Sequence, residues 1–232
     1  MQMLDASLRF SRSTAPLGRT WAMLLAAMLL VASTLLLSAC ASDDLPVHQD
    51  LSRSSFTLLN QDSTSVPFPQ AYEGDILVIG AIYTQCPDIC PVVTANMQDV
   101  HQKLGDTDGV RFITVTFDPR RDTPSRMNAY RNAFGLDGTS WVFLTGAPET
   151  IDALMGELEI KSEIASGDTT GTYFIDHTDQ ITLVDERGRI RYRYHGSGTP
   201  PEIIAEDINK LRGTHTGDSA APGRALSSAF DD

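Results

Sequence analysis

Hydrophobic and polar positions along this chain follow two periods in turn, and the alternation predicts strands followed by helices. Residues 75–83 form a continuous apolar run rich in β-branched side chains, which is typical of a strand buried on both faces. A polar stretch with two cysteines follows, and Pro91 suits the first turn of a helix. Apolar residues then recur at helical spacing up to a glycine: Val92, Val93, Met97, Val100 and Leu104. The segment therefore predicts a strand, a cysteine loop and a helix.

The chain after this unit repeats the alternation. The further predicted elements are strands at 110–117, 141–144, 181–184 and 190–194, and helices at 124–134, 148–158 and 201–211. The turn between the last two strands contains Gly188, which favours a hairpin. Residues 55–61 predict one more strand ahead of this core.

The order of these elements, β-α-β-α-β-α-β-β-α, predicts an α/β fold. Alternating strands and helices favour a mostly parallel central sheet with helices on both faces, and the final hairpin makes that sheet mixed. Two cysteines follow the first long strand at the N-terminus of a helix. Together these features resemble the thioredoxin fold, and we expect a thioredoxin-like domain over residues 55–213.

The first 39 residues have the pattern of a bacterial lipoprotein signal peptide. Residues 1–20 hold three arginines and one acid, and residues 21–37 carry no charge. They lead into Leu37-Ser-Ala-Cys40, which resembles the lipobox whose cysteine is acylated after cleavage. The alternative is an uncleaved membrane span with an incidental cysteine. We expect a lipid on Cys40, and both interpretations place the domain outside the cytoplasm at a membrane, on the periplasmic side if the cell has two membranes.

Composition and charge bound the remaining segments. Residues 40–54 are polar and aperiodic, which predicts a flexible tether. Residues 214–232 are small, polar and rich in Gly, Pro and Ser, which predicts a disordered tail. The formal net charge of −12 argues against a nucleic-acid partner, because phosphate binding needs a basic surface.

Two of the three cysteines remain for chemistry once Cys40 is lipidated. Cys86 and Cys90 enclose a loop so small that a disulfide there would remove little chain entropy, so a redox pair or a metal site is favoured. A helix N-terminus favours the thiolate, which is both a nucleophile and a soft ligand for Cu(I). Thioredoxin-like oxidoreductases have two residues between their cysteines and this chain has three. That spacing allows both metal chelation and a disulfide.

A third metal ligand has to come from elsewhere in the chain. The histidines are His48, His101, His177, His195 and His215. His101 is too far along its helix, roughly 16 Å from Cys90 at about 1.5 Å per residue. His177 precedes the 181–184 strand, and the loop entering this strand of a thioredoxin-like fold passes beside the dithiol. His177 is therefore a candidate ligand with Asp176 as a group that orients its ring, although a solvated loop histidine is the plain alternative.

Three motifs follow one another in a fixed order along the chain. They are Tyr83-Thr-Gln-Cys-Pro-Asp-Ile-Cys-Pro91, Thr116-Phe-Asp-Pro-Arg-Arg-Asp-Thr-Pro124 and Asp176-His177-Thr178. The first matches the Cys-x-x-x-Cys-Pro signature of the Sco/SenC family, copper-binding assembly factors for cytochrome c oxidase, and the other two match the second and third motifs of that family. The chain resembles this family from about Phe56 to Leu211.

The resemblance implies a thioredoxin-like fold and ligation of a copper ion, Cu(I) or Cu(II), by Cys86, Cys90 and His177. It also implies that the protein delivers copper to the dinuclear copper centre of oxidase subunit II, or reduces that centre. Subunit II is then one partner, and a copper donor or thiol reductant is another.

Some positions depart from the family pattern or stay open. Ser63 follows Asp62 where a glycine is usual, and Gly80-Ala81 stand where a larger residue is usual, which leaves the subfamily and the client undecided. Asp118 could face a partner or tune the site, or it could serve only the loop. For Asp122 we favour loop and capping chemistry.

Three functions are compatible with these residues. We expect a copper-binding metallochaperone rather than an enzyme, because this function uses all three candidate ligands. The alternative is a thiol-disulfide oxidoreductase that reduces oxidase or other extracytoplasmic cysteines with Cys86 and Cys90. A peroxide-reducing relative is disfavoured, because the Pro-x-x-x-Thr-x-x-Cys motif is absent.

Overall fold

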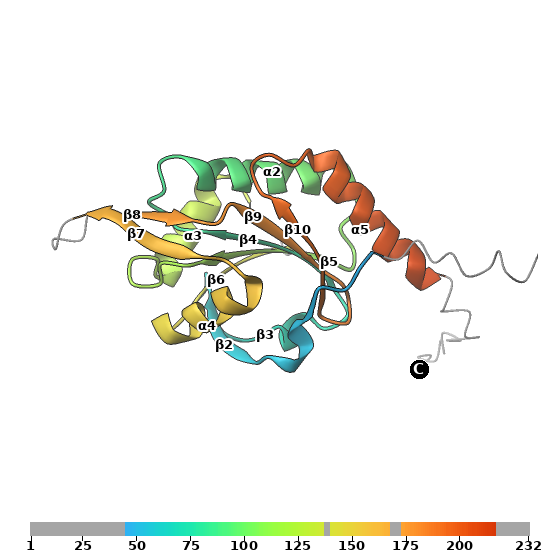
Figure 1. Cartoon of the computed structure of the whole chain (residues 1–232), viewed down its shortest axis with the longest axis horizontal. Helices are drawn as coiled ribbons and strands as arrows, with labels where there is room; N and C mark the ends of the chain where they lie inside the picture. Colours follow the sequence, from blue (N-terminus) through green and yellow to red (C-terminus); the bar gives the residue numbers. More distant parts are fainter. Residues whose placement is uncertain (1–44, 137–139, 168–172, 217–232) are drawn as a thin grey trace, which may run out of the picture. The chain divides into compact units, whose positions relative to one another are not determined.

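The computed structural model describes residues 45–136, 140–167 and 173–216 (Figure 1). The elements are β1 (Gln49–Asp50), the 3-10 helix η2 (Leu51–Arg53), β2 (Phe56–Asn60), β3 (Ser65–Phe68), the 3-10 helix η3 (Gln70–Tyr72), β4 (Ile76–Ile82), α2 (Ile89–Leu104), β5 (Val110–Thr116), α3 (Pro124–Ala133), β6 (Trp141–Thr145), α4 (Pro148–Leu158), β7 (Ser162–Gly167), β8 (Tyr173–His177), β9 (Gln180–Val184), β10 (Arg189–His195) and α5 (Pro201–Thr216).

The main sheet of the described residues has the strand order β1-β10-β9-β4-β5-β6-β2-β3. Its centre, β4-β5-β6, is parallel, and α2 and α3 make the two crossover connections. Strands β9 and β10 are antiparallel, so the sheet is mixed, as predicted. Every residue of β4 is buried, which is the reason for its unbroken apolar run.

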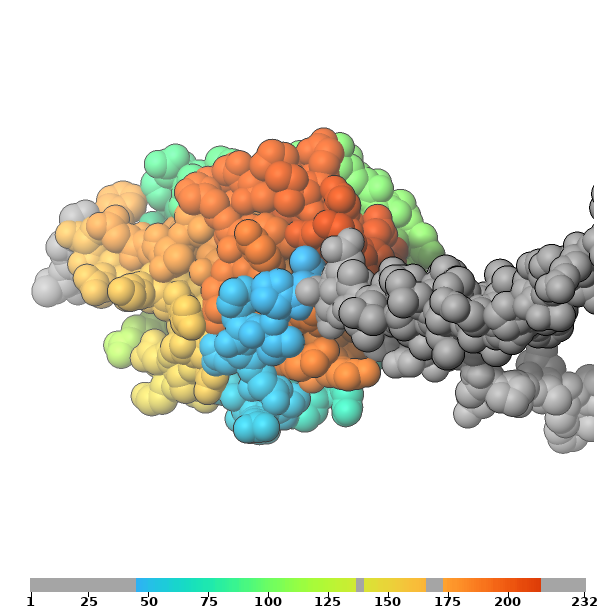
Figure 2. All heavy atoms as spheres, turned by 45° about the vertical axis from the view of Figure 1, so that its right-hand side comes forward, coloured from blue at the N-terminus to red at the C-terminus, as the bar shows by residue number. Residues whose placement is uncertain are grey.

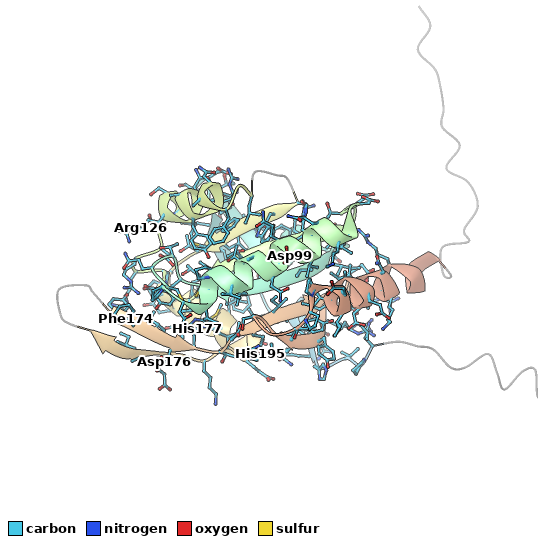
Figure 3. The ribbon with its side chains drawn as sticks, turned by 90° about the horizontal axis from the view of Figure 1, so that it is seen from above. Asp99, Arg126, Phe174, Asp176, His177 and His195 are labelled. Atoms are coloured by element: carbon cyan, nitrogen blue, oxygen red, sulfur yellow. The ribbon has the colours of Figure 1, made fainter. Side chains whose placement is uncertain are left out.

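Helices cover both faces of the sheet, as the alternation predicted. Figure 1 shows α2 and α5 above the sheet and α4 below it. The view from above in Figure 3 places α3 beside α2, and the hydroxyls of Thr94 and Tyr130 join these two helices at 2.9 Å. The expected thioredoxin-like architecture is therefore present, and the cysteine loop lies where β4 ends.

The prediction of a flexible tether over residues 40–54 is wrong from residue 45 onward. Gln49 pairs with Ile190 of β10, and Leu51 is fully buried. The buried guanidinium of Arg191 donates to the carbonyl oxygens of Leu45 and Pro46. Figure 2 shows this first described segment, in blue, against the orange end of the sheet. The segment folds because it covers an open strand edge, and the local sequence pattern does not reveal that edge.

Two other features differ from the predicted boundaries. Helix α5 continues to Thr216, three residues past the expected end of the domain at residue 213. The chain also forms β3 and the β7–β8 hairpin, which the periodicity did not predict. The predicted signal peptide, Cys40 and residues 217–232 lie outside the described residues. No helix of the described part is long and apolar enough to span a bilayer.

The packing of α2 on β4 explains the unusual glycine of this strand. A Cβ at Gly80 would collide with the sulfur of Met97, which is buried on the inner face of α2. The long, flexible methionine side chain therefore occupies the space that a larger residue in β4 would take.

Candidate metal centre

The first two candidate ligands are held by the junction between β4 and α2. The chain leaves β4 after Ile82 and enters α2 at Ile89, so Cys86 lies in the loop and Cys90 in the first turn of the helix. The Cys86 sulfur accepts a hydrogen bond from the backbone N–H of Cys90 at 3.4 Å. Cys86 is half-buried and Cys90 is fully buried. The helix N-terminus therefore faces the more accessible of the two sulfurs.

Burial changes the expected chemistry of Cys90. The sequence predicted that the helix N-terminus favours a thiolate at this residue. In the structure, burial raises the pKa of the Cys90 thiol, and its hydrogen bond with Cys86 acts in the same direction. A metal ion that binds here has to displace the thiol proton, so metal binding and deprotonation of Cys90 occur together.

His177 comes from a separate hairpin and reaches the two cysteines through space. It is the last residue of β8, and its Nε2 lies 3.4 Å from the Cys90 sulfur. Its Nδ1 lies 3.0 Å from the carbonyl oxygen of Thr178, which can only accept, so Nδ1 carries the proton. This tautomer leaves the Nε2 lone pair directed at the cysteines. The sequence predicts a loop at His177, whereas in the structure this residue ends a strand.

Aromatic packing and backbone contacts fix the imidazole ring. The ring centroid lies 4.6 Å from that of Phe117 and 6.1 Å from that of Tyr83. The prediction that Asp176 orients this ring is wrong. Asp176 is exposed, and in Figure 3 its side chain points away from the site. Asp176 points away because successive residues of a strand face opposite sides. The carbonyl of Thr178 orients the ring instead, through its contact with Nδ1.

The three candidate ligands meet at one point. The ligand atoms of Cys86, Cys90 and His177 all lie within 4.8 Å of one another. Within the described ranges, no other group of three or more His, Cys, Asp or Glu residues is arranged to hold a metal ion. Two sulfurs and one imidazole nitrogen are soft and borderline donors that suit copper or zinc and disfavour magnesium and calcium. The residues present therefore fit the copper ion that the sequence motifs imply.

The remaining histidines of the described residues lie elsewhere. His101 stacks near Trp141, and its Nε2 lies 3.0 Å from the hydroxyl of Ser140. His195 is exposed, with Nδ1 3.3 Å from Asp179. His48 is exposed on the segment beside β10. None of these residues belongs to the cluster, and the side chain of His215 is outside the description.

Asp118 and Asp122 are buried supports of the site rather than exposed loop residues. Asp118 is only 4% exposed, which contradicts the reading that it faces a partner. Asp122 accepts hydrogen bonds from the N–H of Thr84 at 2.9 Å and the hydroxyl of Thr116 at 2.6 Å. It thereby ties the cysteine loop to β5. The predicted role of Asp122 in loop and capping chemistry therefore misses its contact with the cysteine loop. The one sequence signal for that contact was the position of Asp122 within the second motif.

Comparisons with known proteins agree with this geometry. The SCO1/SenC family model matches residues 46–213. The SCO1 protein homolog of Bacillus subtilis is 27% identical over 176 residues, covering 75% of this chain and 90% of that protein.

Two solved structures share the fold. Bradyrhizobium japonicum ScoI with copper bound has a TM-score of 0.60 at 29% identity, covering 68% of this chain and 98% of that one. A SCO1/SenC family lipoprotein from Bacillus anthracis has a TM-score of 0.63 at 27% identity, covering 72% of this chain and 97% of that one. With a family model that spans nearly all of the folded residues, this chain belongs to the SCO1/SenC family.

Proposed function

We propose that this protein is a metallochaperone that carries copper and supports assembly of the dinuclear copper centre of cytochrome c oxidase subunit II. The observation that carries the proposal is the convergence of two sulfurs and one imidazole nitrogen within 4.8 Å. The copper-bound ScoI relative supports copper as the cargo. The client follows from what the family resemblance implies, together with a copper donor that loads the site.

The three ligands have different roles in this proposal. Two thiolates satisfy Cu(I), and the imidazole adds the donor that Cu(II) binding needs. Cys86 is the accessible sulfur, so it is the ligand that a donor or client meets first. His177 belongs to a different sheet from the strand that leads to the cysteines, so it is a ligand that can be removed without disturbing the dithiol.

We predict that His177→Ala lowers the affinity for Cu(II) by more than about 100-fold, because loss of a ligand exceeds the usual effect of a supporting residue. Binding of Cu(I) by the two cysteines should survive. The measurement is metal analysis of anaerobically purified full chain, followed by competition titration of each copper oxidation state. His195→Ala is the matched control, since His195 is exposed and outside the cluster. Unchanged Cu(II) affinity in His177→Ala would rule out the three-ligand site.

A thiol-disulfide oxidoreductase is the second candidate, and one observation favours it. Both cysteines are free, their sulfurs lie within 4.8 Å, and only Cys86 is accessible, as expected for an attacking thiol paired with a buried one. The same His177→Ala variant separates the two functions in cells. Failed oxidase assembly supports copper delivery, whereas full assembly supports dithiol exchange with a thiol reductant as partner.

We further propose that a lipid on Cys40 anchors the protein on the extracytoplasmic side of a membrane. The lipobox residues Leu37 to Cys40 support this proposal, as does the similarity to a family lipoprotein from Bacillus anthracis. Cells grown with radioactive palmitate should label the wild-type protein and the Cys86→Ser control, and should not label Cys40→Ser. If the wild-type protein is not labelled, the proposal of a lipid anchor is wrong, and the proposal of a copper site is unaffected.

A further inference from the structure

The hairpin that carries His177 needs an anchor outside itself. Strands β7 and β8 form a separate two-stranded sheet, and Figure 1 shows them extending beyond the main sheet. An isolated two-stranded hairpin is marginally stable in water. Ile164 and Phe174 on this hairpin are 68% and 47% exposed, whereas Ile175 of β8 is half-buried and packs against the core. Apolar packing on the core is therefore limited, and polar contacts to the rest of the domain, such as that of the Ile175 N–H with the Tyr83 hydroxyl at 3.4 Å, help to hold the hairpin in place.

At its His177 end, the two strands of the hairpin are joined to each other by contacts between Thr178 and Lys161. The N–H of Thr178 donates to the carbonyl of Lys161 at 2.9 Å, and the N–H of Lys161 donates to the Thr178 hydroxyl at 3.0 Å. These contacts join β8 to the chain just before β7. They close the base of the hairpin without attaching it to the cysteine loop.

At the opposite end of β8, the guanidinium of Arg121 and the carboxylate of Asp118 attach the hairpin to the domain. Arg121 donates from Nη1 to the carbonyl of Tyr173 at 2.8 Å, and its guanidinium carbon lies 3.5 Å from the centre of the Tyr173 ring. The Tyr173 hydroxyl donates to Asp118 at 2.7 Å, and Arg121 forms an ion pair with the same carboxylate. Arginine, carboxylate and tyrosine thus form a closed cluster around the start of β8.

The same guanidinium also contacts the cysteine side of the site. Nη1 donates to the side-chain oxygen of Gln85, next to Cys86, at 3.1 Å, and the group lies 5.4 Å from the centre of the Tyr83 ring. Gln85 is exposed, and the cysteine loop is independently fixed by Asp122 and by α2. Losing Arg121 would therefore loosen the histidine side of the site far more than the cysteine side.

We infer that Arg121 is a positioning residue that holds β8, and through it His177, at ligand distance from Cys86 and Cys90. The inference rests on the proposed copper function. A planar guanidinium is required because it donates in its plane while its face stacks on a ring, which a lysine ammonium cannot do. Asp118 keeps the guanidinium in the orientation that serves both contacts.

A double-mutant cycle with His177→Ala tests this inference. Arg121→Lys keeps the charge beside Asp118 and removes the planar group. In full-length protein it should lower Cu(II) affinity about 10- to 100-fold, the usual effect of a residue that supports a ligand. In the His177→Ala background the same change should cost less than about threefold, because the ligand that it positions is gone. In the Cu(II)-loaded single variant Arg121→Lys, electron paramagnetic resonance should show a weakened signature of the imidazole nitrogen. Arg120→Lys, an exposed neighbour, should change neither quantity.

Amide hydrogen exchange on the copper-free protein gives a readout that does not need the metal. The amides of β8 should exchange at least about tenfold faster in Arg121→Lys and at the wild-type rate in Arg120→Lys. The variant Asp118→Asn/Arg121→Gln, which removes both charges, should reproduce this result if Arg121→Lys folds poorly. An equal loss of copper affinity in both cycle backgrounds, or unchanged exchange in β8, would overturn the inference. The two proposals can fail separately. If the wild-type protein binds no copper while β8 still exchanges faster in Arg121→Lys, the proposed function is overturned and the anchoring role of Arg121 stands.

Discussion

Cys90→Ser is expected to abolish copper binding while the domain stays folded. Cys90 is fully buried, and its sulfur lies 3.4 Å from Nε2 of His177. Its backbone N–H also contacts the Cys86 sulfur, so Cys90 is next to both other candidate ligands. A serine hydroxyl has nearly the same shape, but it is a hard donor that does not ionise in this buried position. We expect the affinities for Cu(I) and for Cu(II) both to fall by far more than about 100-fold, because Cys90 is a ligand for copper in either oxidation state.

The controls separate loss of a ligand from loss of the fold. Cys86→Ser should also abolish binding, whereas Cys40→Ser should leave the copper stoichiometry unchanged. Metal analysis after anaerobic loading gives the stoichiometry, and urea unfolding monitors stability, which should fall by no more than about 1–3 kcal/mol when a hydroxyl replaces the buried thiol. Retained copper in both Cys86→Ser and Cys90→Ser would mean that the site has been assigned to the wrong residues.

Arg191→Met is expected to destabilise the domain by about 3 kcal/mol. Arg191 is only 2% exposed and pairs with the buried carboxylate of Asp185 at 2.9 Å. Removing one member of a buried pair leaves an uncompensated charge, which costs about 3–5 kcal/mol. The low end applies because Arg189 also bonds to Asp185, at 2.7 Å. Methionine fills much of the same volume, so lost packing adds little.

The loss of Arg191 should also release the start of the folded chain. Its guanidinium holds the carbonyls of Leu45 and Pro46, so we expect protease cleavage within residues 45–53 in the variant and protection in the wild type. Urea unfolding measures the stability change. Arg187→Met, at an exposed position of the neighbouring turn, should stay within about 0.5 kcal/mol. A loss below about 1 kcal/mol in Arg191→Met would show that the buried pair does not hold this edge.

Much of the fold was visible in local patterns. The helix at α2 and the strand at β4 were predicted close to their bounds, because each repeats its period over several turns or residues. The tether was mispredicted because Leu45, Val47 and Leu51 are too few and too irregularly spaced to make a period, although Leu51 is fully buried. The β7–β8 hairpin was missed because both faces of β8 carry apolar residues, Phe174 on the exposed face and Ile175 on the half-buried face, so the residue types do not alternate although the burial does.

By itself, the sequence determined the thioredoxin-like architecture, the cysteine pair at the start of a helix and the candidate histidine. These are properties of neighbouring residues, or of motifs in a fixed order, and they can be read along the chain. Only the tertiary structure decided which nitrogen of His177 faces the sulfurs, that Asp176 points away, and that Asp118 and Arg121 form one buried cluster with Tyr173. The decisive contacts, such as that between Arg121 and Tyr173, join residues more than fifty positions apart, and no local period records which distant side chains will lie together.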